Sequence, residues 1–282
     1  MFTILEKRRL NDSMTLMVVD APFIAKKAHA GQFIILRINE FGERIPLTIA
    51  DYDREKGTIT IIFQKVGKTT TELDQLNEGE AILDFIGPLG KASEIEGYKK
   101  VAVIGGGAGC AIAYPQAKAL HNMGAKVDII AGFRNKDIII LEDEMKAASD
   151  NLILTTDDGS NGNKGFVTDA LRKNIEDGAG YDLVIAIGPL PMMRAVCNLT
   201  KEFNIKTIIS MNPIMIDGTG MCGGCRLTVG GKTKFACVDG PDFDGHEVDF
   251  DEAIKRTRTY SDMEKESARE YNCRLMEGAK NA

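Results

Sequence analysis

The hydrophobic pattern of this chain changes near residue 98, and this change constrains the fold more than any other feature. Before it lie short β-rich runs separated by Gly, Asp and Pro, at 3–10, 14–21, 32–38, 44–52, 57–66 and 80–90. Short strands at this spacing are typical of an antiparallel β-barrel. After it, apolar strands alternate with turns and helical segments, which is typical of a parallel sheet covered by helices. We therefore predict a mixed fold, an antiparallel β-barrel followed by a Rossmann-like α/β domain.

A glycine-rich turn follows the first strand of the predicted parallel sheet. It contains Gly105, Gly106, Gly107 and Gly109 and precedes a helix that begins near Ala111. Backbone amides at a helix start attract phosphate, and glycine lets a pyrophosphate approach the chain closely. The spacing departs from G-x-G-x-x-G, and a strand-to-helix turn can be glycine-rich for packing alone. The turn predicts a dinucleotide site and leaves that alternative open.

A second segment strengthens the dinucleotide prediction. Gly188 and Pro189 end another apolar strand, and Met192 and Met193 open the next helix. Ligands of parallel sheets bind at the carboxyl ends of the strands, so we expect this segment to lie beside the glycine turn. For Met193, ordinary packing inside the helix layer is an equally good interpretation.

Near the C-terminus, Asp217, Cys222, Cys225 and Cys237 form a D-x4-C-x2-C-x11-C array. Plant-type [2Fe-2S] ferredoxins use a similar spacing with cysteine at the first position, and a carboxylate can also ligate iron. Glycines in the same loop favour a cluster, because they leave backbone amides free to face the sulfides: 218, 220, 223 and 224. A zinc site and a redox-active dithiol remain alternatives. The other cysteines, 110, 197 and 273, are scattered and are expected to be small buried or neutral residues.

Composition excludes several classes of protein. The chain has 282 residues, 44% of them hydrophobic, and a net charge of -6 without a basic run, which indicates a globular protein that does not bind nucleic acid. The apolar runs are shorter than the roughly 18 residues of a membrane span, and the start of the chain lacks the apolar stretch of a signal peptide. We therefore expect a cytoplasmic protein without membrane contact. Three scattered histidines offer no acid-base pair for substrate chemistry.

These patterns divide the chain into four segments. We expect the barrel at 1–97, the nucleotide-binding α/β domain at 98–212 and a small iron-sulfur loop domain at 213–245. The charged, helical segment 246–282 is expected to be a tail that docks a partner.

The order of these segments and their motifs resembles the ferredoxin-NADP reductase superfamily over nearly the whole chain. The motifs are RIPLT at 44–48, VGKTT at 66–70, GPLG at 87–90, GGGAG at 105–109, GPLPMM at 188–193 and the cysteine loop. The resemblance implies FAD in the barrel, with Arg44 on its pyrophosphate and Thr48 on its isoalloxazine ring, and it assigns the FAD site to Arg44, Pro46, Leu47, Thr48, Gly67, Lys68, Thr69 and Thr70. The alternative for Lys68 and its neighbours is a simple capped helix start.

The same resemblance assigns the NAD(P) site to Gly105, Gly106, Gly107, Gly109, Asp157, Gly188, Pro189 and Met192. For Asp157 a solvated acidic turn is an equally good interpretation. The preference between NAD(H) and NADP(H) stays open, because Arg134 and Asp137 both follow the second strand of the sheet.

More narrowly, the chain is similar to two related families, the iron-sulfur electron-transfer subunits of dihydroorotate dehydrogenase and the small subunits of NADH-dependent reduced ferredoxin:NADP oxidoreductases. Asp217 favours the second family, because the first carries cysteine there. This similarity implies a heterodimer with a larger flavoprotein that resembles the small subunit of glutamate synthase and holds FAD and [4Fe-4S] clusters. It also implies electron bifurcation that reaches ferredoxin through the complex. The alternatives are the dihydroorotate subunit and a regulatory module whose loop holds structural zinc.

Overall fold

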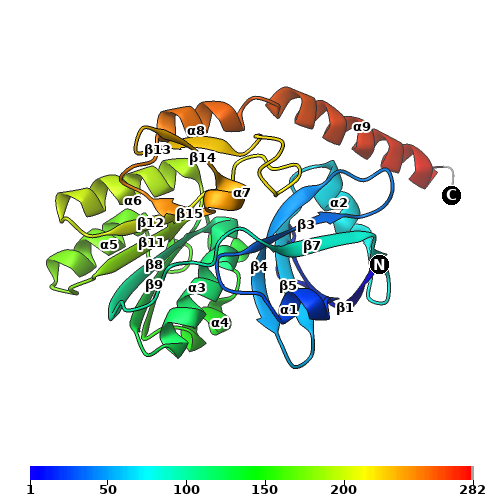
Figure 1. Ribbon diagram of the computed structural model, residues 1–282. Helices are drawn as coiled ribbons and strands as arrows, with labels where there is room; N and C mark the ends of the chain where they lie inside the picture. Colours follow the sequence, from blue (N-terminus) through cyan, green and yellow to red (C-terminus); the bar gives the residue numbers. More distant parts are fainter. Residues whose placement is uncertain (281–282) are drawn as a thin grey trace.

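The computed structural model describes residues 1–280 and, for side chains, residues 1–271. Its first part is a seven-stranded antiparallel sheet in the order β6-β1-β2-β5-β4-β3-β7. Figure 1 shows this sheet curving round on itself, with the rest of the chain against one side. The strands are β1 (Phe2–Arg9), β2 (Met14–Asp20), β3 (Phe33–Arg37), β4 (Ile45–Asp53), β5 (Thr58–Gln64), β6 (Ala81–Ile82) and β7 (Asp84–Leu89).

The two ends of this sheet meet because one apolar run splits into two strands. β6 pairs with β1 and β7 pairs with β3, and only Leu83 separates β6 from β7. We had expected a single strand over 80–90. If the run paired with a single neighbouring strand, the sheet would keep open edges. Because the run is broken into β6 and β7, it pairs with both outer strands and nearly closes the barrel. The predicted antiparallel barrel is therefore confirmed, with α1 (Pro22–Ala25) and α2 (Lys68–Gln75) in its connections.

The second part is a six-stranded sheet in the order β10-β9-β8-β11-β12-β15, covered on both faces by helices. Its strands are β8 (Lys100–Gly106), β9 (Lys126–Phe133), β10 (Asn151–Thr156), β11 (Leu183–Ile187), β12 (Thr207–Ser210) and β15 (Asp242–Asp244). Every residue of β11 is buried, as expected for a parallel strand covered on both faces. The predicted Rossmann-like α/β fold is confirmed.

Helices and short 3-10 turns connect these strands. They are η1 (Gly107–Gly109), α3 (Cys110–Asn122), η2 (Lys136–Ile138), α4 (Glu142–Ala147), α5 (Val167–Glu176) and α6 (Leu190–Glu202). The five strands from β8 to β12 run parallel, and β15 joins the edge antiparallel to β12. The sequence had placed the residues of β15 in the iron-sulfur segment. This strand anchors that segment to the nucleotide sheet.

The third part lies above the junction of the first two (Figure 1). It contains the hairpin β13 (Arg226–Val229) and β14 (Lys232–Phe235), the short helix α7 (Ala236–Asp239), then α8 (Phe250–Thr257) and α9 (Ser261–Lys280). α8 lies over the hairpin, while α9 reaches across to α2 of the barrel, where Tyr271 Oη is 3.2 Å from Gln75 Oε1. None of the helices in the described part of the chain is both long and apolar enough to cross a membrane. Cys273 was predicted to be a small buried or neutral residue, and its side chain lies outside the described residues.

Candidate functional site

The strand order predicts a ligand crevice beside the first glycine turn. β8 is central, and the chain runs to β9 and β10 on one side and to β11 and β12 on the other. In open parallel sheets, ligands bind outside the carboxyl ends of the strands at such a reversal of order. Gly109 lies there, and a Cβ at this position would be 2.4 Å from the carbonyl oxygen of Ile187. Only glycine lets the start of α3 pack so closely on the end of β11.

The second predicted segment packs against the same glycine turn. A Cβ on Gly106 would lie 2.4 Å from Met192 Sδ and 3.1 Å from Pro189 Cδ, and a Cβ on Gly188 would lie 3.1 Å from Gly106 Cα. The structure thus brings together the two segments that the sequence placed side by side. Met193, in contrast, is fully buried in the core, which favours ordinary packing for this residue.

Asp157 lies on the same edge of the sheet but farther from the crevice. It follows β10, two strands from β8, and its backbone N–H donates to the carbonyl of Phe133 at the end of β9. Its side chain is exposed. The geometry does not bring Asp157 into contact with the glycine turn, and it stays a predicted nucleotide residue.

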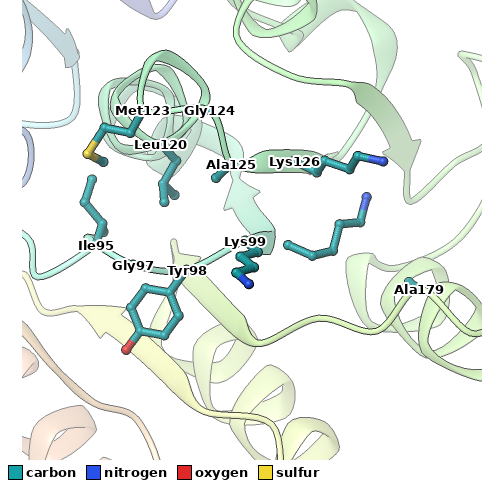
Figure 2. Close-up of a pocket in the computed structure, with 11 residues that line it drawn as sticks. Ile95, Gly97, Tyr98, Lys99, Leu120, Met123, Gly124, Ala125, Lys126 and Ala179 are labelled. Carbon is teal, nitrogen blue, oxygen red and sulfur yellow. The ribbon is translucent and has the colours of Figure 1, made fainter.

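A cavity of about 740 Å³ lies at the opposite end of the nucleotide sheet. Figure 2 shows Tyr98, Lys99 and Lys126 around it, near the amino ends of β8 and β9. Dinucleotides bind at the carboxyl ends of such strands, so this cavity is separate from the candidate nucleotide site.

In the barrel, one hydrogen bond joins the residue before the RIPLT motif to the VGKTT motif. The hydroxyl of Thr69, in the first turn of α2, donates to the carboxylate of Glu43. Arg44 is the next residue after Glu43, so its backbone lies near the amino end of α2, and its side chain is exposed. A cation and unpaired helix amides together suit a diphosphate. Sequence analysis missed Glu43, although its place directly before Arg44 was a usable signal.

The start of α2 is ordered by threonine hydroxyls. Thr70 Oγ1 accepts from the backbone N–H of Gly67 at 3.2 Å, and Thr71 Oγ1 donates to the Gly67 carbonyl at 2.8 Å. These bonds are those of a capped helix. Lys68 is partly exposed at the first position of α2, where a phosphate would meet both its charge and the helix amides.

The strand that carries the rest of the flavin motif pairs with β3. Pro46, Leu47 and Thr48 of β4 lie opposite Ile35, Ile34 and Phe33 respectively. All three are partly buried, so they form part of the barrel wall. This pairing fixes their position relative to β3, which itself contacts the cysteine loop.

The contact between barrel and cysteine loop is close. Gly218, at a φ of +77°, packs so tightly that a Cβ would lie 2.8 Å from Leu89 Cδ1 and 2.9 Å from Ile35 Cγ1. Because Ile35 is the strand neighbour of Pro46, the loop with Asp217 lies one strand away from the predicted flavin motif. The fold therefore places the cysteine loop beside the barrel, and sequence spacing had not shown this.

Asp217 organises the cysteine loop through hydrogen bonds. Its Oδ1 accepts from the backbone N–H and the hydroxyl of Thr219, and its Oδ2 accepts from the backbone N–H of Cys222 at 2.7 Å. These donors, first the Thr219 amide, hold the pKa of the Asp217 carboxyl well below its usual range. The side chain is thus a carboxylate at neutral pH, the form that can ligate iron.

The three cysteines differ in position. Cys225 and Cys237 are buried and their sulfurs are 3.2 Å apart, whereas Cys222 is exposed. In the part of the chain that the structure describes, no three histidine, cysteine or acidic side chains are gathered so that they could hold a metal ion. Asp217 and Cys222 must therefore move relative to the buried pair before all four side chains can share one site.

The surroundings of the sulfurs suit an iron-sulfur cluster. The backbone N–H of Gly224 lies 3.4 Å from Cys222 Sγ, and that of Cys237 lies 3.4 Å from Cys225 Sγ. Amide donors to sulfur tune iron-sulfur centres. Burial, and then the contact with Cys225, raises the pKa of Cys237 to about 12, so a bound cation is needed to hold it as a thiolate. Three thiols and a carboxylate on a glycine loop with such amides fit the group.

Two arginines that sequence analysis missed hold the carbonyls between the first two cysteines. Arg226 Nη1 donates to the Gly223 carbonyl at 3.2 Å, and Arg256 Nη2 donates to the Gly224 carbonyl at 3.1 Å. Arg226 directly follows Cys225, but Arg256 lies in a charged helix interpreted as a docking tail. No local pattern indicated that α8 returns to the loop.

Comparisons with known proteins agree with this arrangement. Residues 212–249 match the model of the iron-sulfur cluster binding domain of dihydroorotate dehydrogenase B, and residues 103–198 match the oxidoreductase NAD-binding domain. These ranges contain the four predicted cluster ligands and both segments of the crevice. The chain thus contains an iron-sulfur cluster binding domain and an NAD-binding domain.

Similar whole proteins were also found. The chain is 47% identical to a protein of Thermotoga maritima named as a dihydroorotate dehydrogenase B (NAD(+)) electron transfer subunit homolog, over 93% of this chain and 92% of the relative. It is 52% identical to an uncharacterized Clostridium beijerinckii protein, over 94% and 92%. The structure of an NADH-dependent reduced ferredoxin-NADP oxidoreductase matches with a TM-score of 0.91 and 44% identity, over 95% of this chain and 97% of that one. The barrel, the NAD-binding domain, the cysteine loop and these relatives together show that the chain is an oxidoreductase subunit that belongs to the family of dihydroorotate dehydrogenase B electron transfer subunits and their homologues.

Proposed function

We propose that this chain exchanges hydride with NAD(H) at a bound FAD and relays single electrons through a [2Fe-2S] cluster to a larger flavoprotein partner. The observation that carries the proposal is the packing of Gly218 on Ile35, which places the cysteine loop one strand from the predicted flavin motif. Nicotinamide delivers two electrons together and an iron-sulfur cluster accepts one, and bound flavin supplies the chemistry that links them.

Each predicted site residue has a role in this proposal. Arg44 and the start of α2, with Gly67, Lys68, Thr69 and Thr70, bind the FAD diphosphate, and Thr48 donates a hydrogen bond to the flavin ring from the wall formed with Pro46 and Leu47. The turn Gly105, Gly106, Gly107 and Gly109 binds the nucleotide pyrophosphate, and Gly188, Pro189 and Met192 form the facing wall, with Asp157 farther along the edge. Asp217, Cys222, Cys225 and Cys237 ligate the cluster.

The segment boundaries are part of the same proposal. We place the FAD-binding barrel at 1–97, the nucleotide domain at 98–212, the cluster domain at 213–245 and the docking tail at 246–282. The pairing of β15 with β12 supports close attachment of the cluster domain to the nucleotide domain.

The partner that we propose carries FAD and [4Fe-4S] clusters and passes electrons to ferredoxin by flavin-based bifurcation. The solved relative at 44% identity is described in terms of bifurcation by an NADH-dependent reduced ferredoxin-NADP oxidoreductase, and Asp217 stands at the first ligand position. The names of several curated relatives support a second candidate, the electron transfer subunit of dihydroorotate dehydrogenase B. A co-purified partner that reduces ferredoxin supports the first candidate. An FMN-containing partner that oxidises dihydroorotate supports the second.

The chain itself can be tested first, after purification without oxygen. NADH should bleach its flavin absorption, and reduction should give the S = 1/2 electron paramagnetic resonance signal of a [2Fe-2S] cluster. Colourless protein with stoichiometric zinc would overturn the proposal and leave the zinc module.

The FAD site can be tested by Arg44→Ala. A charge-assisted hydrogen bond to phosphate contributes about 1.5–3 kcal/mol, so FAD affinity should fall about tenfold to a hundredfold. The affinity is measured by diluting the protein and following the fluorescence of the flavin that is released. The matched control is Arg54→Ala, whose guanidinium donates to the Ala28 carbonyl within the barrel. Equal FAD affinity in the two variants would remove Arg44 from the site.

A further inference from the structure

Helix α8 is fixed to the cluster domain and to the nucleotide domain. The Asp249 side chain caps its first turn by accepting from the Glu252 N–H, and the Asp249 N–H donates to the Thr228 carbonyl of β13. Glu252 Oε2 accepts from the Thr228 N–H at 3.0 Å. On the other side, Arg194 of α6 pairs with Asp251 at 2.8 Å. α8 is therefore held both to the hairpin and to α6.

Arg256 extends this support to the cysteine loop. It lies four residues after Glu252, on the same face of α8. Its Nη2 donates at 3.1 Å to the carbonyl of Gly224, in the turn between Cys222 and Cys225. One face of α8 thus holds the hairpin through Glu252 and the ligand turn through Arg256.

The guanidinium of Arg256 is partly withdrawn from water. Its Nε is buried and makes no hydrogen bond within the described residues. A partly buried charge is screened by solvent and salt less than an exposed one. Arg226, which holds the neighbouring Gly223 carbonyl, is exposed, so its charge is screened more.

We propose that Arg256 is a positioning residue that fixes the Cys222–Cys225 turn and whose charge raises the reduction potential of the cluster. Reduction adds one negative charge to the cluster, and a nearby, poorly screened cation stabilises that form. The carbonyl bond also holds the turn in a conformation in which the Gly224 N–H faces Cys222 Sγ. This inference rests on the proposed iron-sulfur function.

The test compares three arginines in the full chain with its cluster. The variants are Arg256→Gln, Arg226→Gln and Arg258→Gln, where Arg258 is an exposed residue at the end of the same helix. The midpoint potential of the cluster is measured by redox titration followed by electron paramagnetic resonance. We expect the largest fall for Arg256→Gln, a smaller fall for Arg226→Gln and no change for Arg258→Gln. Equal midpoints in the wild type and Arg256→Gln would overturn the inference.

A second variant, Arg256→Lys, separates charge from loop geometry. We expect it to keep a midpoint near that of the wild type but to lose iron faster to a chelator, because lysine cannot reproduce the guanidinium contact. If Arg256→Gln loses its cluster while Arg256→Lys keeps it and both apoproteins melt like the wild type, the inference is supported. If both variants unfold, Arg256 belongs to the general fold and the inference fails. A wild-type chain without iron would instead refute the proposed function.

Discussion

The nucleotide crevice and the cysteine loop are both glycine-rich, but they are prepared for their ligands to different degrees. In the crevice, Gly106, Gly109 and Gly188 already pack against neighbouring backbone and side chains at distances that only glycine allows. In the loop, Cys222 is exposed, and within the described residues the predicted ligand side chains are not gathered. In the loop, glycine allows close packing at Gly218 and also a left-handed backbone at Gly218, Gly220 and Gly223.

This difference follows from what each ligand supplies. A dinucleotide brings no bonds strong enough to reorganise a sheet, so its site must be largely formed beforehand. A cluster brings four metal-ligand bonds, and their free energy can order a loop. We therefore expect the two regions to respond differently to mutation and to loading.

Loss of a buried ligand should have the largest effect. Cys225→Ser should abolish the cluster, because the buried pair of Cys225 and Cys237 is the fixed half of the site. Iron and sulfide content and visible absorption measure this. Cys197→Ala is the matched control, because Cys197 is buried among α6 residues and its pKa is raised to about 12 by that burial. Full cluster content in Cys225→Ser would contradict the assignment of this ligand.

Hydrogen exchange should distinguish the two regions when their ligands are bound. Cluster reconstitution should slow exchange of amides at 214–225 by about 100-fold, because metal-ligand bonds add to the hydrogen bonds that hold the loop. NADH should slow exchange at 105–109 by much less, because that turn is already packed. Similar protection of both segments by their ligands would show that the crevice also forms on binding.

Packing of the crevice can be tested by a pair of changes. Gly106→Ala should lower the free energy of unfolding by about 1–3 kcal/mol, because its methyl group would lie 2.4 Å from Met192 Sδ. Adding Met192→Ala should recover about 1 kcal/mol of this loss. Denaturant unfolding of the two single variants and the double variant gives the coupling. Strictly additive effects would mean that Gly106 and Met192 do not pack as the crevice requires.

The smallest effect concerns a buried carboxyl on β15, the strand that joins the cysteine-loop segment to the parallel sheet. Asp242 of β15 accepts from Ser93 Oγ at 2.6 Å and from Gln116 of α3 at 3.1 Å, while its Oδ1 is buried without a partner in the described residues. Burial raises the pKa of Asp242. The folded state therefore binds the proton more tightly than the unfolded state. Asp242 therefore contributes to the free energy of unfolding below its ordinary pKa of about 3.9. This contribution is lost as the pH rises toward the pKa that Asp242 has in the folded state.

The variant Asp242→Asn should not show this loss of stability as the pH rises. Between about pH 4 and neutrality, the free energy of unfolding of the wild type should fall relative to that of the variant, because burial raises the pKa of Asp242. Urea unfolding at several pH values measures it. Asp244→Asn, two residues along the same strand and exposed, is the control. If Asp242→Asn also changes the cluster content, the cysteine loop and the parallel sheet do not respond independently to mutation, and the expected difference between the two regions is wrong.

Much of the architecture followed from local patterns. The change near residue 98 predicted the barrel and the parallel sheet, and both are confirmed. The carboxyl-end rule predicted that Gly188 would lie beside the glycine turn, and the packing of Gly188 on Gly106 agrees. The split of 80–90 into β6 and β7 was missed, because it depends on which two distant strands the run covers.

The contacts that join the sites were also missed. Glu43 with Thr69, Arg256 with Gly224 and Gly218 with Ile35 are separated in sequence by 26 residues or more. No periodicity or fixed spacing in the sequence reveals such contacts, because the chain between the two residues can take any path that the core allows.

The sequence by itself determined the chemistry of this protein: three thiols and a carboxylate at ferredoxin-like spacing, and glycine turns at the ends of buried strands. These features are local, since a ligand loop and a strand-to-helix turn each need only a few consecutive residues. Only the tertiary structure decided how the sites meet, with β15 tying the cluster domain to the nucleotide sheet and Gly218 seated on the barrel wall. That arrangement arises because burial of apolar surface is non-directional, and the final neighbours are set by the shapes of all the packed elements together.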